Sequence, residues 1–160
     1  MAAQRLPAAV LRDPVHLLAL GLGTGLAPLA PGTAGTLLAV LPAWLVAEWP
    51  WPARLALVAV LFALGVWICG ESARRLGVHD HPAIVLDEVV GFLAISLAAP
   101  VGVTGMAAAF LAFRVFDIVK PWPIRDVDHR LRGGIGIMLD DLIAAGYGAA
   151  CLLIYQYFFP

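Results

Sequence analysis

The chain has 160 residues, of which 62% are hydrophobic and 13% charged, with 10 basic and 11 acidic side chains and a formal net charge of −1. In a typical soluble domain about a quarter of the residues are charged, so this composition, with a mean hydropathy of +0.91, excludes an ordinary soluble protein. The scattered basic residues and the small net charge also exclude a nucleic-acid-binding protein.

We therefore expect an all-α fold. It should be a single membrane-embedded domain over residues 1–160, built as a helical bundle of about four to five short hydrophobic helices plus a Gly/Pro-broken N-terminal segment. Residues 1–13 contain no apolar stretch long enough for a signal peptide, which predicts a cytoplasmic N-terminal segment. After Pro14, a short helix should run into irregular backbone, and PGTAGT, residues 31–36, should form a turn.

Later apolar runs predict five helical segments that pass back and forth. The expected segments begin at about Ala34 and then cover residues 54–70, 84–100, 106–120 and 137–159. The apolar runs themselves have about 13 to 18 residues, short of the roughly 20 that cross a bilayer. Some segments should therefore be tilted or re-entrant.

Charge predicts the orientation of these segments. The polar segment Glu71–Pro82 carries two arginines and the loop 121–134 carries three, which places both on the cytoplasmic side. Alternation then brings the polar clusters of the chain to the cytoplasmic face: PGTAGT, the loop His79–Asp80–His81, Asp87–Glu88, Arg114 to Lys120, and Asp140–Asp141.

The stretch FRVFDIVKPWPI, residues 113–124, places three ionisable groups in apolar sequence. Arg114, Asp117 and Lys120 follow one another at i, i+3 spacing, so a helix presents all three on one flank before Pro121. Ionisable groups in such a setting usually serve chemistry. The alternative is a juxtamembrane cluster whose cations extend to lipid headgroups.

Acidic residues on three predicted helices indicate a site for a hard cation such as Mg²⁺. Asp87, Glu88, Asp117, Asp140 and Asp141 supply the oxygen ligands that Mg²⁺ prefers, and a cation offsets their mutual repulsion. Adjacent carboxylates on a helix diverge by about 100°, so we expect one residue of each pair to face the site. For either pair, stabilisation of a helix start is the alternative.

PGTAGT offers a phosphate-binding helix start through Gly32, Thr33, Gly35 and Thr36, with exposed backbone N–H groups and hydroxyls. Arg114 and Lys120 should point to the same face. A metal site beside a phosphate site predicts metal-assisted hydrolysis of a lipid phosphate. His79, Asp80 and His81 fit either a metal corner or a solvated loop, and their role stays open.

Four blocks, PGTAGT, HDH followed by IVLDEVVG, FRVFDIVKPWPI and GGIGIMLDD, resemble the signature blocks of the phosphatidylglycerophosphatase A family in order and spacing. The resemblance implies a multi-pass, Mg²⁺-dependent hydrolase of the bacterial inner membrane that converts phosphatidylglycerophosphate to phosphatidylglycerol. It implies the acidic site residues Asp87, Glu88, Asp117, Asp140 and Asp141, and the phosphate-side residues Thr33, Arg114 and Lys120. Catalysis would then rest on Asp87, Asp117, Asp141, Arg114 and Lys120.

A membrane transporter that passes cations or protons along carboxylates is the alternative from another class. Such carboxylates usually lie near the bilayer midplane between discontinuous helices. Here we expect the acidic residues at helix ends, which favours the enzyme.

Overall fold

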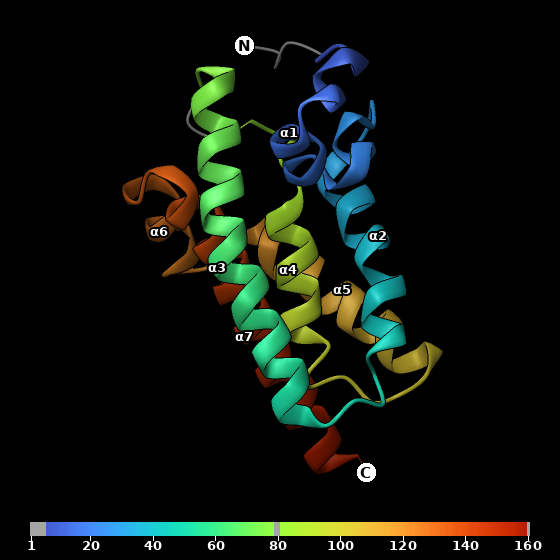
Figure 1. Ribbon diagram of the computed structural model, residues 1–160. Coiled ribbons are helices and arrows are strands. Elements are labelled where there is room, and N and C mark those ends of the chain that lie inside the picture. The colour runs from blue at the N-terminus through green and yellow to red at the C-terminus, as the bar shows by residue number, and fades with distance from the viewer. Residues whose placement is uncertain (1–5, 79–80, 160) are drawn as a thin grey trace.

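The computed structural model describes residues 6–78 and 81–159, and within these ranges the chain is all-helical, as expected (Figure 1). Two 3-10 helices, η1 (Ala8–Arg12) and η2 (Gly21–Leu26), flank the short helix α1 (Pro14–Ala19). The bundle itself follows as α2 (Pro31–Leu45), α3 (Trp51–Leu76), α4 (Leu86–Ile95), α5 (Val103–Val119), α6 (Ile124–Arg130) and α7 (Gly133–Phe158).

α3 and α7 have the length and composition of membrane-spanning helices. Each has 26 residues, and only 28% and 44% of their most apolar windows are buried inside the protein. The outward apolar surface on these helices, on α2 and on α5 suits contact with lipid rather than water. The chain is therefore a membrane helical bundle, although these two helices are longer than the short segments expected from sequence.

α4 is the short helix at the centre of the bundle. It packs against α2, α3, α5 and α7, and Val90, Gly91, Phe92, Leu93 and Ile95 are buried on it. Ten residues rise about 15 Å, so α4 reaches only part of the way across a bilayer. The helix was expected to continue to Pro100 but ends at Ile95, and its first turn carries Asp87 and Glu88 into the bundle.

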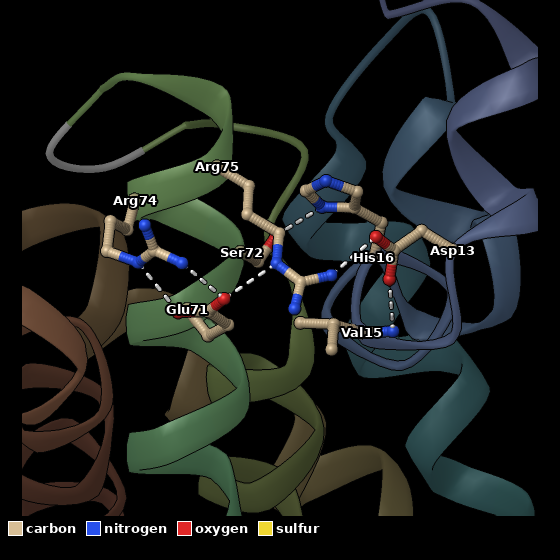
Figure 2. A network of polar contacts seen from close by, with 7 residues as sticks. All are labelled: Asp13, Val15, His16, Glu71, Ser72, Arg74 and Arg75. Atoms are coloured by element: carbon tan, nitrogen blue, oxygen red, sulfur yellow. Dashed lines mark hydrogen bonds and ion pairs between the residues drawn. The ribbon is translucent and has the colours of Figure 1, made fainter.

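The N-terminal segment is tied to the end of α3 by the polar network that Figure 2 shows. Arg75 pairs with Asp13 at 2.5 Å and with Glu71 at 2.7 Å, while the buried His16 lies 2.8 Å from the Ser72 hydroxyl. Asp13 also caps α1 by accepting a hydrogen bond from the Val15 N–H. That N–H, and after it the Arg75 guanidinium, lower the pKa of Asp13.

This network explains why the expected loop at Glu71 is helical. Glu71 pairs with Arg74 at i+3 and with Arg75 at i+4, and both spacings stabilise a helix. α3 therefore continues to Leu76, six residues beyond the expected end. The polar composition of this segment was misread as a loop because the charges satisfy one another along the helix.

Two glycine-rich segments expected to be turns or loops are helical as well. α2 begins at Pro31, which suits the first helical position because its missing N–H needs no partner there. α7 begins at Gly133, four residues earlier than expected. The loop 121–134 contains the short helix α6, which sequence analysis missed.

A buried arginine joins three helix ends at the opposite end of the bundle. Arg54, in the first turn of α3, donates to the Ala47 carbonyl after α2 at 3.3 Å and to the Ser96 carbonyl at the end of α4. Carbonyl groups at helix C-termini carry partial negative charge, so the guanidinium is stabilised there. This contact anchors the end of the bundle remote from the starts of α2 and α4.

Close packing of α3 on α7 depends on Gly134. A Cβ on Gly134 would lie 1.7 Å from the Val66 carbonyl oxygen. We predict that Gly134→Ala lowers the free energy of unfolding by about 1–3 kcal/mol, because the two helices must separate. The matched control is Gly146→Ala on the same helix, where no described atom lies within 4 Å of the added Cβ. Thermal unfolding in detergent tests this, and equal melting temperatures for the two variants would contradict it.

Candidate functional site

A pocket of about 370 Å³ lies where the starts of α2 and α4 meet the end of α5 and the third turn of α7. Its polar lining comes from four helices and the residue that ends α5. The lining residues are Ala30, Pro31, Gly32, Pro82, Ile84, Asp87, Glu88, Arg114, Asp117, Ile118, Lys120, Asp140 and Asp141. The pocket thus gathers all five predicted acidic residues and both predicted cations.

The α2 wall of the pocket is backbone rather than side chain. A Cβ on Gly32 would lie 2.1 Å from Glu88 Oε1 and 3.2 Å from Arg114 Nη1, so only glycine lets these side chains approach. Pro31 has no N–H, which leaves the N–H groups of Gly32 and Thr33 in the first turn without intrahelical acceptors. No described side chain caps this helix start. These backbone groups are therefore available to an anion.

Two cations of the pocket are each held by a carboxylate. Arg114 Nη1 lies 2.6 Å from Asp117 Oδ2, one turn along α5, and 4.0 Å from Glu88 Oε1. Lys120 Nζ donates to Asp140 Oδ2 at 2.7 Å. These pairs fix the direction of both cations, and both side chains line the pocket.

Two residues at the rim hold a left-handed backbone. Ala30 has φ +46° and Lys120 has φ +45°, a region that L-residues adopt at a cost of about 1–2 kcal/mol. Each precedes a proline, Pro31 and Pro121. Such local strain is typical of functional sites, where the surrounding structure holds it in place.

Asp87, Glu88 and Asp141 form a compact acidic group in the pocket. One ligand oxygen from each lies within 4.8 Å of the others. The side chain missing at Gly91 permits this, because a Cβ there would lie 3.3 Å from Asp141 Cβ and 2.7 Å from the Phe113 ring. Gly91 follows Asp87 by one helical turn, so close approach of α4 and α7 at Gly91 also brings Asp87 near Asp141.

These three carboxylates fit a divalent cation. Asp87 Oδ1, Glu88 Oε2 and Asp141 Oδ2 are buried and have no hydrogen-bond partner within the described part of the chain. Buried carboxylate oxygens without a partner are costly, and neighbouring carboxylates repel. A cation bound by the three oxygens would give each oxygen a partner and would offset the repulsion among the carboxylates. Carboxylate oxygens are also the ligands that hard cations prefer.

Other predicted residues lie at the edge of the pocket or outside it. Thr36 is buried and lies 3.5 Å from Arg114 Nη1, while its hydroxyl donates to the Gly32 carbonyl. Gly35 packs on Val85, whose Cβ would lie 2.7 Å from an added Cβ. His81 accepts a hydrogen bond from the Ala83 N–H. His79 and Asp80 lie outside the described residues.

Two geometric expectations about the acidic pairs were wrong. One residue of each pair was expected to face away, but both members of each pair line the pocket. The first turn of α4 lets both Asp87 and Glu88 reach inward, while Asp140 faces Lys120 and Asp141 faces α4. Asp140 and Asp141 also lie two turns inside α7, not at its start, so stabilisation of a helix start does not explain them.

Sequence analysis missed the apolar rim of the pocket, which consists of Ala30, Pro31, Pro82, Ile84 and Ile118. Ile118 follows Asp117 directly and is 69% exposed on α5. A charged pocket with an apolar rim inside a membrane bundle suits a ligand that is part anion and part lipid. In the sequence, Ile118 between Asp117 and Lys120 could have indicated that apolar side chains also line the pocket.

Fold and pocket together define an integral membrane protein whose pocket holds a group of three carboxylates beside two cationic side chains. Comparison with known sequences identifies the protein family. Residues 17–156 match the family described as phosphatidylglycerophosphatase A. The chain belongs to the phosphatidylglycerophosphatase A family.

Relatives cover nearly the whole chain. It is 41% identical to phosphatidylglycerophosphatase A of Escherichia coli K12, over 92% of this chain and 87% of that protein. It is 43% identical to the Haemophilus influenzae protein of the same name, over 92% of this chain and 91% of that protein. A relative from Bacteroides thetaiotaomicron is 35% identical over 88% of this chain and 92% of that protein. It is provisionally named a phosphatidylinositol-3-phosphatase. No solved structure matches the chain.

Cation binding at the acidic group has an effect on stability that can be measured. We predict that a divalent cation at 100 times its dissociation constant stabilises the protein by about 2.7 kcal/mol. Asp141→Asn should abolish this gain, yet raise the melting temperature in chelator because one repulsive charge is gone.

Thermal unfolding with and without cation measures both effects. Asp126→Asn is the matched control, because Asp126 is half-exposed on α6, outside the pocket. A full cation response in Asp141→Asn would contradict the assignment.

Proposed function

We propose that this protein hydrolyses the terminal phosphomonoester of phosphatidylglycerophosphate to give phosphatidylglycerol and inorganic phosphate. The observation that carries the proposal is the pocket in which Asp87, Glu88 and Asp141 lie beside Arg114 and Lys120. Family membership supports the same activity, since two relatives are named for it. Asp140 and Asp141 lie two turns inside α7, so the expected position at helix ends does not exclude the transporter alternative; the two cations beside the acidic group favour a phosphate ligand instead.

The phosphate group should bind between the two cations and the start of α2. Arg114 and Lys120 are oriented by Asp117 and Asp140, and both line the pocket, so their positive charges can stabilise the phosphoryl oxygens. The N–H groups of Gly32 and Thr33 add two donors at a positive helix end. These contacts neutralise charge on the oxygens as the ester bond breaks, which lowers the barrier.

Asp87, Glu88 and Asp141 are the residues that would hold Mg²⁺, with Asp117 and Asp140 beside them. When bound, Mg²⁺ supplies Lewis acidity that polarises a phosphoryl oxygen and activates water. Burial of the three carboxylates excludes bulk water from their side of the pocket and keeps them oriented. Arg114, paired with Asp117, and Lys120, paired with Asp140, hold the phosphate next to these three carboxylates.

The reaction is a displacement at phosphorus. Water forms the new phosphorus–oxygen bond, the bond to the glycerol oxygen breaks, and that oxygen takes a proton to become the terminal hydroxyl of phosphatidylglycerol. The phosphate leaves as the inorganic ion. The lipid portion need not leave the membrane, because the pocket opens at a rim that includes the exposed Ile118.

Placement in the bacterial inner membrane with the pocket toward the cytoplasm is part of the proposal. Two arginines, Arg74 and Arg75, lie at the end of α3, and three more lie in α6 or shortly after it. Both segments lie near the end of the bundle that holds the pocket (Figure 1). The positive-inside rule favours the cytoplasmic side for such segments. Three of the five exposed tryptophans, Trp49, Trp51 and Trp122, lie outside the pocket and suit membrane interfaces.

Phosphate release from phosphatidylglycerophosphate in detergent tests the activity directly. We predict turnover in Mg²⁺, none in chelator, and a loss of at least about a hundredfold in Asp141→Asn, because a metal ligand is removed. Asp117→Asn should lose as much, because it removes the carboxylate that orients Arg114.

Asp126→Asn serves as the control and should keep full activity, since its carboxylate lies on α6 outside the pocket. Near-normal turnover in both Asp117→Asn and Asp141→Asn, with the control also active, would rule out the acidic site. Activity that persists in chelator would rule out the metal while leaving the substrate assignment intact.

A further inference from the structure

A second cavity, of about 310 Å³, lies on the flank of α7 and is lined by apolar groups. Ile143, Gly146, Tyr147 and Ala150 form its walls, and we refer to it as the α7 groove. No described atom lies within 4 Å of the position of a Cβ on Gly146. The groove therefore exists because Gly146 and Ala150 carry almost no side chain.

The α7 groove continues the Asp140 side of the phosphate pocket. Ile143, Tyr147 and Ala150 follow Asp140 by three, seven and ten residues, the spacing of one helix face. Asp141 points about 100° away from Asp140 around the helix and belongs to the opposite wall. A ligand that enters past Lys120 and Asp140 therefore meets the groove next.

One short segment builds the boundary between pocket and groove. Lys120 Nζ donates to Asp140 Oδ2 at 2.7 Å, and two residues later the Trp122 carbonyl accepts a hydrogen bond from the Tyr147 hydroxyl at 3.0 Å. The Tyr147 ring also packs on Phe116 of α5, with ring centroids 5.5 Å apart. The segment from Lys120 to Trp122 thus connects the pocket and the groove, so their relative position is fixed.

The distance from the phosphate pocket to the far end of the groove matches the depth of one membrane leaflet. The groove itself, from Ile143 to Ala150, rises about 10 Å, and the ten residues from Asp140 to Ala150 rise about 15 Å, which is half of the roughly 30 Å hydrocarbon core. α7 is one of the two described helices with the length and composition to cross a membrane. A phosphate held at Lys120 would therefore leave an attached acyl chain alongside the groove.

Resting on the function proposed above, we infer that the α7 groove holds one acyl chain of the phospholipid whose phosphomonoester occupies the pocket. Lipid chains are as apolar as the groove, so the contact adds little net hydrophobic energy in a membrane. Its effect is to orient the chain relative to the phosphate, which favours a productive position of the reacting group. The groove thereby selects diacyl lipids over soluble phosphomonoesters.

Filling the groove tests this inference. In Gly146→Leu, the KM for long-chain phosphatidylglycerophosphate in mixed micelles should rise roughly tenfold or more, whereas the KM for a water-soluble short-chain analogue should not change. Cys151→Leu is the matched control, because Cys151 is exposed on the same helix but does not line the groove. Gly146→Ala provides a milder variant with a smaller effect of the same sign if Gly146→Leu fails to fold.

A second measurement does not depend on turnover. Phosphatidic acid with a photoreactive diazirine in one acyl chain, presented in phosphatidylcholine vesicles, should label residues 143–150 in the unmodified protein. Labelling there should fall in Gly146→Leu and persist in Cys151→Leu.

The two measurements separate failure of the groove from failure of the proposed activity. Equal losses on long-chain and short-chain substrates, or labelling that is not centred on residues 143–150, would overturn the inference. If the unmodified protein releases phosphate from neither substrate, the proposed activity fails, and the labelling pattern alone decides whether the groove binds a chain.

Discussion

Repulsion among buried carboxylates is the constraint on which this structure depends. Two like charges 4 Å apart repel by about 4 kcal/mol at an effective dielectric constant of 20, and ligand oxygens of Asp87, Glu88 and Asp141 lie within 4.8 Å of one another. Such a group persists only where positive charge is close. Arg114 and Lys120 supply part of it from the next wall, and a bound divalent cation would supply the rest. The same charges that permit the acidic group also form a phosphate site, so fold stability and chemistry share one set of interactions.

Glycine at three helix contacts makes this arrangement possible. Gly32 admits Glu88 and Arg114 to the α2 wall, Gly91 admits Asp141 and Phe113 to α4, and Gly134 admits the α3 backbone to α7. Without a large hydrophobic driving force between helices in lipid, close backbone approach is the main source of association. Two of these contacts, at Gly32 and Gly91, lie where the helices carry the acidic residues. At the other end of the bundle, Arg54 joins the ends of α2 and α4 and holds the same helices in place.

Sequence patterns predicted the helical class, the five long or central helices and the residues that meet in the pocket. The lengths of the apolar runs predicted the helical class and the five helices. Ionisable residues in apolar surroundings predicted which residues meet in the pocket. Boundaries were less predictable where charges or glycines lay within a helix. Glu71 and its two arginines satisfy one another on α3, and Gly134 lies in α7 because the α3 backbone comes too close there for a side chain. The i, i+3 spacing indicated the Arg114–Asp117 pair, whereas the Lys120–Asp140 pair and the α7 groove depend on tertiary structure and could not be inferred from spacing.

The central claim is that oxygens from α4 and α7 share one divalent cation. Anomalous X-ray scattering from crystals grown with Mn²⁺ tests it most directly. We predict an anomalous peak within coordination distance of Asp87, Glu88 and Asp141, and loss of that peak in Asp141→Asn. A fully occupied Mn²⁺ site that contacts none of these three residues, with the pocket otherwise as described, would contradict the claim.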